Sequence, residues 1–181
     1  MQPMRYLDKW LEQNAGGESY LFMLSDLKAL FPALSQGSFK TLLSRSVQAG
    51  YLERVSRGLY LYPRVAPTGL VLFHAAARLR ANHCNYISLE TVLSDAGVIS
   101  QIPINCISVM SSGRSSRVSC GRFGTIEFIH TKKSPADLVN KLYYDDRCRM
   151  WRASVALALS DMKSTHRNCD LIDWDVANEL I

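Results

Sequence analysis

The chain has 181 residues, of which 48% are hydrophobic, and it carries a formal net charge of +5. This length suits one ordinary domain or two small ones, and the apolar content is sufficient for a hydrophobic core. No segment approaches the roughly 20 apolar residues that a membrane span needs, and the amino terminus lacks the apolar core of a signal peptide. We therefore expect a cytoplasmic protein that has no membrane partner.

The cysteines are odd in number and widely scattered, with no CxxC pair among them: Cys84, Cys106, Cys120, Cys148 and Cys169. This pattern indicates neither a disulfide framework nor a zinc site. It is typical of a reduced protein, and we expect no metal and no cofactor.

Positive charge is concentrated in the first two thirds of the chain. Residues 1–64 contain eight Lys and Arg against five Asp and Glu (+3), and residues 65–152 contain eleven against six (+5). Residues 153–181 contain two against five (−3). The basic regions favour a polyanionic partner, whereas the acidic tail suits a solvated helix face or a protein contact.

The first elements in chain order are helical. Apolar spacing predicts a helix over residues 4–13, ended by the glycines at 16 and 17. Residues 18–24 fit either a short strand or a linker. A second short helix is predicted over 25–31, followed by a loop over 32–37 that contains Pro32 and Gly37.

A longer helix is predicted over residues 38–49. Phe39, Leu42, Leu43 and Val47 recur at helical spacing, and Gly50 is a typical residue just past a helix end. The opposite face carries hydrogen-bonding groups and two cations: Gln36, Ser38, Lys40, Thr41, Ser44, Arg45 and Gln48.

A hairpin is predicted over residues 53–62, where Val55, Leu59 and Leu61 are strand-like and Ser56-Arg57-Gly58 forms the turn. Together with the preceding helices, this order predicts a winged helix-turn-helix over residues 25–63, within a domain spanning 1–64. Such a domain presents a polar helix face beside a basic β-turn, which a DNA groove can accept.

We predict two classes of DNA contact from this arrangement. Gln36, Ser38, Thr41, Ser44 and Arg45 would lie nearest the base edges, while Lys40, Arg54 and Arg57 would mostly contact phosphates. Two alternatives remain open at this point: a small helical packing domain with a solvated polar face, and a protein-docking module. The cations on this face favour DNA over docking.

The segment 63–69 contains two prolines and separates a second domain, residues 65–181. Helices are predicted over 70–81 and 88–95, with Ser88 as a cap and Gly97 as a stop. Strands are predicted over 104–110, 116–120 and 124–130, and closing helices over 149–163 and 174–181. The expected fold class is therefore α+β: the winged helix-turn-helix, then a small mixed α/β domain with a short antiparallel sheet.

No constellation of residues supports catalysis. The four histidines, at 74, 83, 130 and 166, stand in no metal-spaced pair, and His83 and Cys84 would point to opposite sides of a strand. Asp145 and Asp146 have no visible catalytic partner, and no glycine-rich phosphate loop is present. We expect a protein that is not an enzyme.

After the predicted winged helix-turn-helix, the chain contains Tyr86-Ile87-Ser88, then Ala96-Gly97, then Gln101-Ile102-Pro103 and a strand that ends at Met110. In this order, these motifs resemble the AbiEi family of antitoxins and autorepressors from type IV toxin–antitoxin, or abortive infection, systems. The family has His-Gly where this chain has Ala96-Gly97. A later Ala-Leu-x-Asp motif is similar to the stretch that ends at Asp161. The resemblance covers residues from about 5 to about 165.

The resemblance implies a bacterial repressor that binds inverted repeats in double-stranded operator DNA upstream of its own operon. It also implies neutralisation of a co-expressed nucleotidyltransferase toxin, with type IV systems acting without a stable complex. The departure at Ala96 leaves open a transcriptional regulator without antitoxin activity. We expect a monomer or a DNA-assisted dimer.

Six arginines of the second domain form a possible antitoxin surface or an extension of the DNA footprint: Arg114, Arg117, Arg122, Arg147, Arg149 and Arg152. The alternative is that they are scattered solubilising charges. A ligand pocket in this domain also stays open, since nothing in residues 65–181 identifies a ligand.

Overall fold

The computed structural model describes residues 2–100 and 105–181. The protein has an α+β fold and divides into two compact units, Met1–Val71 and Leu72–Ile181. Among the described residues, each helix is too short or too polar to cross a bilayer.

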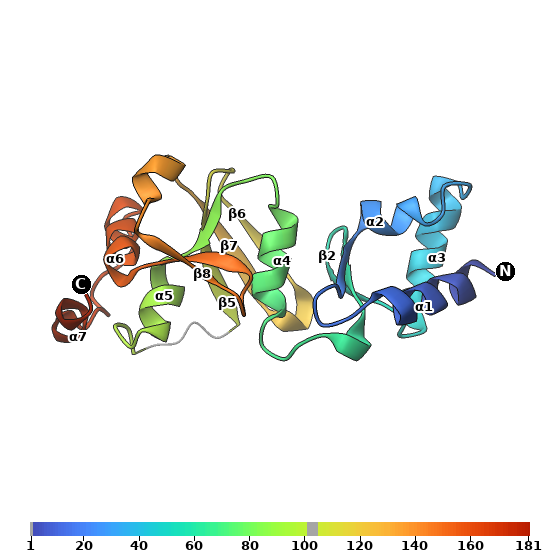
Figure 1. Ribbon diagram of the computed structural model, residues 1–181, viewed down its shortest axis with the longest axis horizontal. Coiled ribbons are helices and arrows are strands. Elements are labelled where there is room, and N and C mark those ends of the chain that lie inside the picture. Colours follow the sequence, from blue (N-terminus) through green and yellow to red (C-terminus); the bar gives the residue numbers. More distant parts are fainter. Residues whose placement is uncertain (1, 101–104) are drawn as a thin grey trace. The chain divides into compact units, whose positions relative to one another are not determined.

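In its described residues, the first unit combines three α-helices with a small sheet (Figure 1). The helices are α1 (Pro3–Asn14), α2 (Leu24–Ala29) and α3 (Gln36–Gln48), close to the predicted ranges. In α1, Leu7 and Leu11 are completely buried, one helical turn apart. These residues share a core with Phe22, Leu27 and three residues of α3, namely Phe39, Leu42 and Leu43.

The sheet of the first unit is antiparallel. Its strands, in the part of the unit described, are β1 (Leu21–Met23), β2 (Glu53–Ser56) and β3 (Leu59–Leu61), in the order β1-β3-β2. The predicted hairpin is thus present, and its turn contains Gly58 at φ +80°, a conformation that costs glycine little. The segment 18–24, left open by the sequence, supplies β1, which pairs with β3.

The second unit contains a mixed sheet flanked by helices. Its helices are α4 (Val71–Leu79, beginning at the last residue of the first unit), α5 (Leu89–Asp95), α6 (Val155–Ser164) and α7 (Trp174–Glu179). The six strands found among its described residues are β4 (Asn85–Ile87), β5 (Cys106–Ser111), β6 (Ser116–Ser119), β7 (Thr125–His130), β8 (Leu142–Asp145) and β9 (Met150–Ala153). Helix α5 packs against α6 and β5, and α6 also contacts β9.

The prediction of a short antiparallel sheet in this unit was wrong. The strand order is β6-β7-β5-β4-β9-β8, and β5 pairs with β7 in parallel, as β4 does with β9. The three predicted strands exist as β5, β6 and β7, but β7 inserts between the other two, so β5 and β6 are not a hairpin. The strands β4, β8 and β9 were not predicted, because they are short and lack a clear apolar alternation.

The predicted helix over 149–163 was also wrong in its first part. Residues Met150–Ala153 form β9, which pairs with both β8 and β4. Helix α6 begins only after Ser154, whose hydroxyl accepts a hydrogen bond from the amide of Leu157 at 3.2 Å. Pairing with β4 and β8 therefore holds Met150–Ala153 as a strand, and the helix begins only after the cap at Ser154.

The positions of three helices in the second unit agree with the predictions made from the sequence. Helix α5 ends before Gly97, which has a φ of +74°, and α4 and α7 lie within their predicted ranges. Ser88 stands at the N-cap of α5, but its side chain makes no capping bond and donates to Asp161 instead. The Gln101-Ile102-Pro103 motif and the first residue of the predicted strand 104–110 lie outside the described residues.

Candidate nucleic-acid interface

Helix α3 begins at a well-defined cap. The Ser35 hydroxyl accepts a hydrogen bond from the Ser38 amide at 3.2 Å, so the helix starts two residues before the predicted position. Phe39, Leu42 and Leu43 fix its inner face in the core, while Ser46 is buried and donates to the carbonyl of Leu42. The outer face of α3 is therefore held by packing and not by its polar residues.

All eight residues predicted to contact DNA are exposed in the structure: Gln36, Ser38, Lys40, Thr41, Ser44, Arg45, Arg54 and Arg57. They do not form one continuous surface, however. Two separate hollows flank α3, and seven of these residues are divided between them. Gln36, the first residue of the helix, lines neither hollow.

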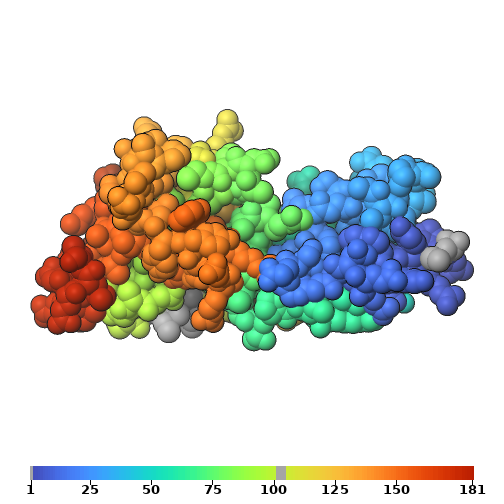
Figure 2. Space-filling view, in the orientation of Figure 1, coloured from blue at the N-terminus to red at the C-terminus, as the bar shows by residue number. Residues whose placement is uncertain are grey.

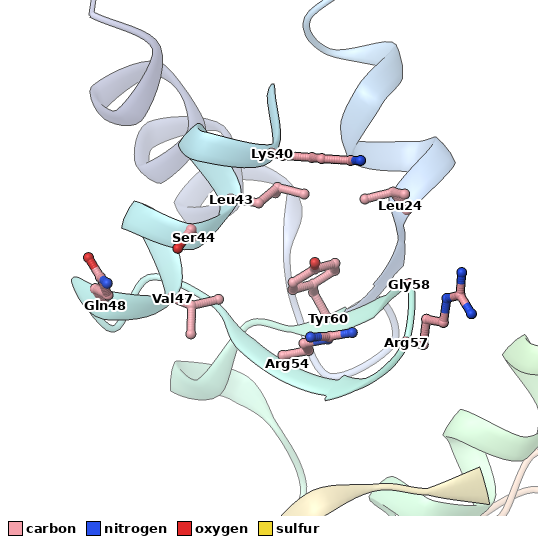
Figure 3. Close-up of a pocket in the computed structure, with 10 residues that line it drawn as sticks. All are labelled: Leu24, Lys40, Leu43, Ser44, Val47, Gln48, Arg54, Arg57, Gly58 and Tyr60. Atoms are coloured by element: carbon pink, nitrogen blue, oxygen red, sulfur yellow. The ribbon is translucent and has the colours of Figure 1, made fainter. Parts of the chain in front are cut away.

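The first hollow lies between α3 and the β2–β3 hairpin, and we call it the α3–hairpin groove. It encloses about 690 Å³ and is lined by Leu24, Lys40, Leu43, Ser44, Val47, Gln48, Arg54, Arg57, Gly58 and Tyr60. Figure 3 shows Lys40 extending from α3 above Leu43, while Arg54 lies beneath the ring of Tyr60 and Arg57 points outward from the turn. Apolar side chains thus form the floor, and cations from two elements surround it.

The charged side chains that line this groove, among the described residues, are all basic. None of the described residues that line it is acidic. Within residues 2–100 and 105–181, no ion pair engages Lys40 or Arg57, and Arg54 donates from Nε only to the carbonyl of Ser56 at 3.4 Å. The positive charge therefore remains available to an anion, because internal carboxylates do not neutralise it.

The second hollow lies on the other flank of α3, against the start of α1. It encloses about 500 Å³ and contains Ser38, Thr41 and Arg45 beside Gln2, Pro3 and Met4. The Thr41 hydroxyl donates to the carbonyl of Gly37 at 3.1 Å, which directs it back along the helix. Between the two hollows, Ser44 and Thr41 provide a ridge of short side chains.

Sequence reasoning missed part of the groove. Leu24 is 40% exposed although it opens α2, and Tyr60 and Val47 are half-buried on the groove floor. Gln48 was assigned to the outer face but not to the set of contact residues. Its helical spacing from Ser44 and Thr41 is the signal that would have included it.

The six arginines of the second unit do not form one surface. Arg114, Arg117 and Arg122 are exposed on or beside the edge strand β6. Arg117 lies opposite Glu127 in the β6–β7 register, and the guanidinium of Arg122 lies 4.3 Å from the centroid of the Phe123 ring. Of the six arginines predicted to form a surface, these three lie together on the surface of the unit.

Arg80, which was not predicted to have a role, holds the turn that carries Arg114. Its guanidinium donates to the hydroxyls of Ser111 at 3.0 Å and Ser116 at 2.8 Å, and to the carbonyl of Arg114 at 2.5 Å. It also lies 4.2 Å from the centroid of the Phe128 ring. These contacts fix the backbone at Arg114 while the Arg114 side chain stays exposed.

Arg147, Arg149 and Arg152 are placed differently. Arg147 is exposed, Arg149 is half-buried, and Arg152 is only 7% exposed. The Arg152 guanidinium pairs with Asp95 at 2.6 Å and with Asp145 at 3.1 Å. Burial opposes its charge, but the bond to Asp95 raises the pKa of Arg152. Arg152 therefore supports the fold and is not part of a surface.

Residues of the family-like motifs meet inside the second unit. Ser88 donates to Asp161 at 2.7 Å, and Lys133 forms an ion pair with the other oxygen of the same carboxylate. Asp161 is completely buried, and burial together with the charge of Asp161 raises the pKa of the nearby Tyr86. Tyr86, Ser88 and Asp161 thus form one buried polar cluster, although they lie far apart in the sequence.

The histidines, cysteines and acidic residues that the structure describes form no group that could hold a metal ion. His83 and Cys84 are exposed, whereas His74 is buried with its Nε2 2.7 Å from the carbonyl of Arg147. Burial opposes ionisation of Asp145, but hydrogen bonds from the amides of Arg147 and Cys148 lower its pKa, as in an ordinary turn.

Aromatic residues are exposed on both faces of the β8–β9 hairpin. Tyr144 and Trp151 lie opposite each other in the register, are each about half exposed and pack edge-on with ring centroids 5.5 Å apart, whereas the half-exposed Tyr143 lies opposite Arg152 on the other face. In the space-filling view, the orange atoms, which include this hairpin and the segment before it, occupy much of the visible face of the second unit (Figure 2).

Comparisons with known proteins leave the geometry as the main guide to function. No family model matches the chain, and none of the curated proteins is significantly similar to it.

Proposed function

We propose that the first unit is a winged helix-turn-helix that binds double-stranded DNA, and that the protein represses its own operon. The observation that carries this proposal is the α3–hairpin groove, in which cations from α3 and from the hairpin surround one hollow that no described acidic residue lines. A phosphodiester backbone is the polyanion that such a rim suits.

The outer surface of α3 supports the same proposal. Its exposed ridge consists of short polar residues, Thr41 and Ser44, with Gln48 at the end and Arg45 on one flank. A helix with such a ridge fits the major groove, where these groups reach base edges by hydrogen bonding. The hairpin turn with Arg57 then serves as the wing. The inverted repeats and the autoregulation are taken from the resemblance to the AbiEi family.

The test is a titration of the whole protein against its own upstream DNA and a scrambled duplex, at several salt concentrations. Three phosphate contacts, from Lys40, Arg54 and Arg57, predict a slope of log binding constant against log salt of about −2.7 for each bound copy. The matched control is Lys9→Ala, which removes one exposed cation from α1 that lines neither hollow. Weak binding that is equal on both duplexes would contradict the proposal and favour a protein-docking module.

We also propose that the second unit neutralises a nucleotidyltransferase toxin, as the resemblance implies. The exposed group Arg114, Arg117 and Arg122 supports this part, because it gives this unit a cationic surface at one sheet edge. The test is rescue of toxin-expressing cells by the whole protein carrying Arg114→Glu and Arg117→Glu. Loss of rescue with unchanged operator binding would support it, and full rescue would exclude this surface.

A further inference from the structure

Lys28 of α2 does not point into solvent but turns back onto the segment that joins α2 to α3. Its Nζ donates to the carbonyl of Phe31 at 2.9 Å and to the carbonyl of Leu34 at 2.5 Å. The side chain is half-buried, and hydrogen bonds from a charged group are stronger than neutral ones. One ammonium group thus bridges two carbonyls of the interhelical turn.

The same ammonium also reaches α3. It lies 5.3 Å from the centroid of the Phe39 ring, and that ring packs against Phe31 with centroids 6.3 Å apart. Phe39 is the first core residue of α3 and is 3% exposed. Lys28 therefore contacts the turn and the inner face of α3 together.

The next residue after this fixed carbonyl is the N-cap of α3. Leu34 immediately precedes Ser35, whose hydroxyl accepts from the amide of Ser38. The orientation of the first turn of α3, with Gln36 and Ser38, consequently depends on where Leu34 is held. Hydrogen bonds to base edges require this orientation, whereas the attraction between a cation and a phosphate tolerates small shifts.

We infer that Lys28 is a positioning residue, which sets the direction in which α3 presents its base-reading side chains and adds no phosphate contact of its own. This inference rests on the proposed function. It assigns opposite roles to two lysines of the same unit: Lys28 acts through α3 on sequence preference, and the exposed Lys40 acts on the DNA backbone.

The experiment compares Lys28→Met with Lys40→Ala in the whole protein, using operator and scrambled duplexes over a range of salt. Circular dichroism first establishes a temperature at which both variants are fully folded. Lys28→Met should reduce the ratio of operator to scrambled affinity by about tenfold, the discrimination of one base contact, with the salt slope unchanged. Lys40→Ala should reduce the magnitude of the slope by about 0.9 and leave the ratio unchanged.

Two results would overturn the inference. An unchanged ratio with a reduced slope for Lys28→Met would make Lys28 a phosphate contact, and an unchanged ratio and slope would remove it from DNA binding altogether. If the unsubstituted protein shows no operator preference, the proposed function fails, and hydrogen exchange then tests the contact itself. Lys28→Met should accelerate exchange of the Leu34, Ser38 and Phe39 amides by about tenfold. Unchanged exchange would show that Lys28 does not hold the start of α3.

Discussion

The two units differ in how the cations of their candidate surfaces and cores are placed. On the first unit, Lys40, Arg45 and Arg57 of α3 and the hairpin turn are exposed and form no ion pair with described residues, although Arg64 pairs with Glu12. In the second unit, Lys133, Arg152 and Arg167 are paired with carboxylates. Residues 65–152 carry the larger excess of positive charge, yet two of their cations, Lys133 and Arg152, are paired inside the fold. Net charge alone therefore does not locate a polyanion-binding surface.

The largest effect is expected where an internal cation is removed. Lys133→Met leaves the completely buried Asp161 without its counter-ion, and loss of one partner of a buried pair costs about 3–5 kcal/mol. Urea unfolding measures this as a lower free energy of unfolding. The double variant Lys133→Met, Asp161→Asn should recover part of the loss. A change below about 1 kcal/mol would mean that the pair contributes as weakly as a surface pair.

A smaller effect is expected for the surface of the first unit that we propose to contact base edges. If Arg45 contacts a guanine with both terminal nitrogens, Arg45→Ala should relax preference at one base pair by about 1–3 kcal/mol. Binding to a set of single-substituted operators measures this. Stability should not change, because Arg45 is exposed. Unaltered preference at every position would place the DNA face elsewhere.

Substitution in the hairpin turn, the proposed wing, should change the affinity for both duplexes equally. Arg57→Ala should weaken binding to operator and scrambled DNA alike and reduce the magnitude of the salt slope by about 0.9, because a phosphate contact carries no sequence information. Titrations at four salt concentrations measure both quantities. Selective loss of operator binding would instead give Arg57 a role in base recognition.

The smallest effect concerns pH and an internally bonded carboxylate. The pKa of Asp145 is lowered in the folded protein, so its contribution to stability is present above the unfolded pKa and is lost as pH falls. The melting temperature should therefore fall less between about pH 5 and pH 3 for Asp145→Asn than for the unsubstituted protein. Asp146→Asn, at the exposed neighbouring residue, is the control and should follow the unsubstituted protein.

Local signals in the sequence were sufficient for much of the first unit. Phe39, Leu42 and Leu43 recur at helical spacing, and Gly58 marks the hairpin turn, so α3 and the β2–β3 hairpin were predicted from nearby residues alone. The exposure of the predicted contact residues followed from the same periodicity. Their division between two hollows did not, because it depends on where α1 and the hairpin pack against α3.

The second unit depends on contacts that local patterns do not encode. Arg152 resembles a surface residue in the sequence, and its burial is explained only by its ion pairs with Asp95 and Asp145, which lie on other elements. The strand β9 reads as part of a helix until its pairing with β4 and β8 is known. Parallel pairing in general joins segments separated by a connecting crossover, so neighbouring residues cannot reveal it.

The position of β4 within the sheet has a consequence for the order in which the chain folds during synthesis. Tyr86 in β4 pairs with Trp151 in β9, so the middle of the sheet is incomplete until nearly the whole chain has left the ribosome. The described strands of the first unit all lie before Tyr62, so this unit can fold much earlier. A nascent chain can therefore carry a folded first unit while β4 is paired with β5 but still lacks β9, and premature termination before Met150 would leave one edge of β4 without its partner strand.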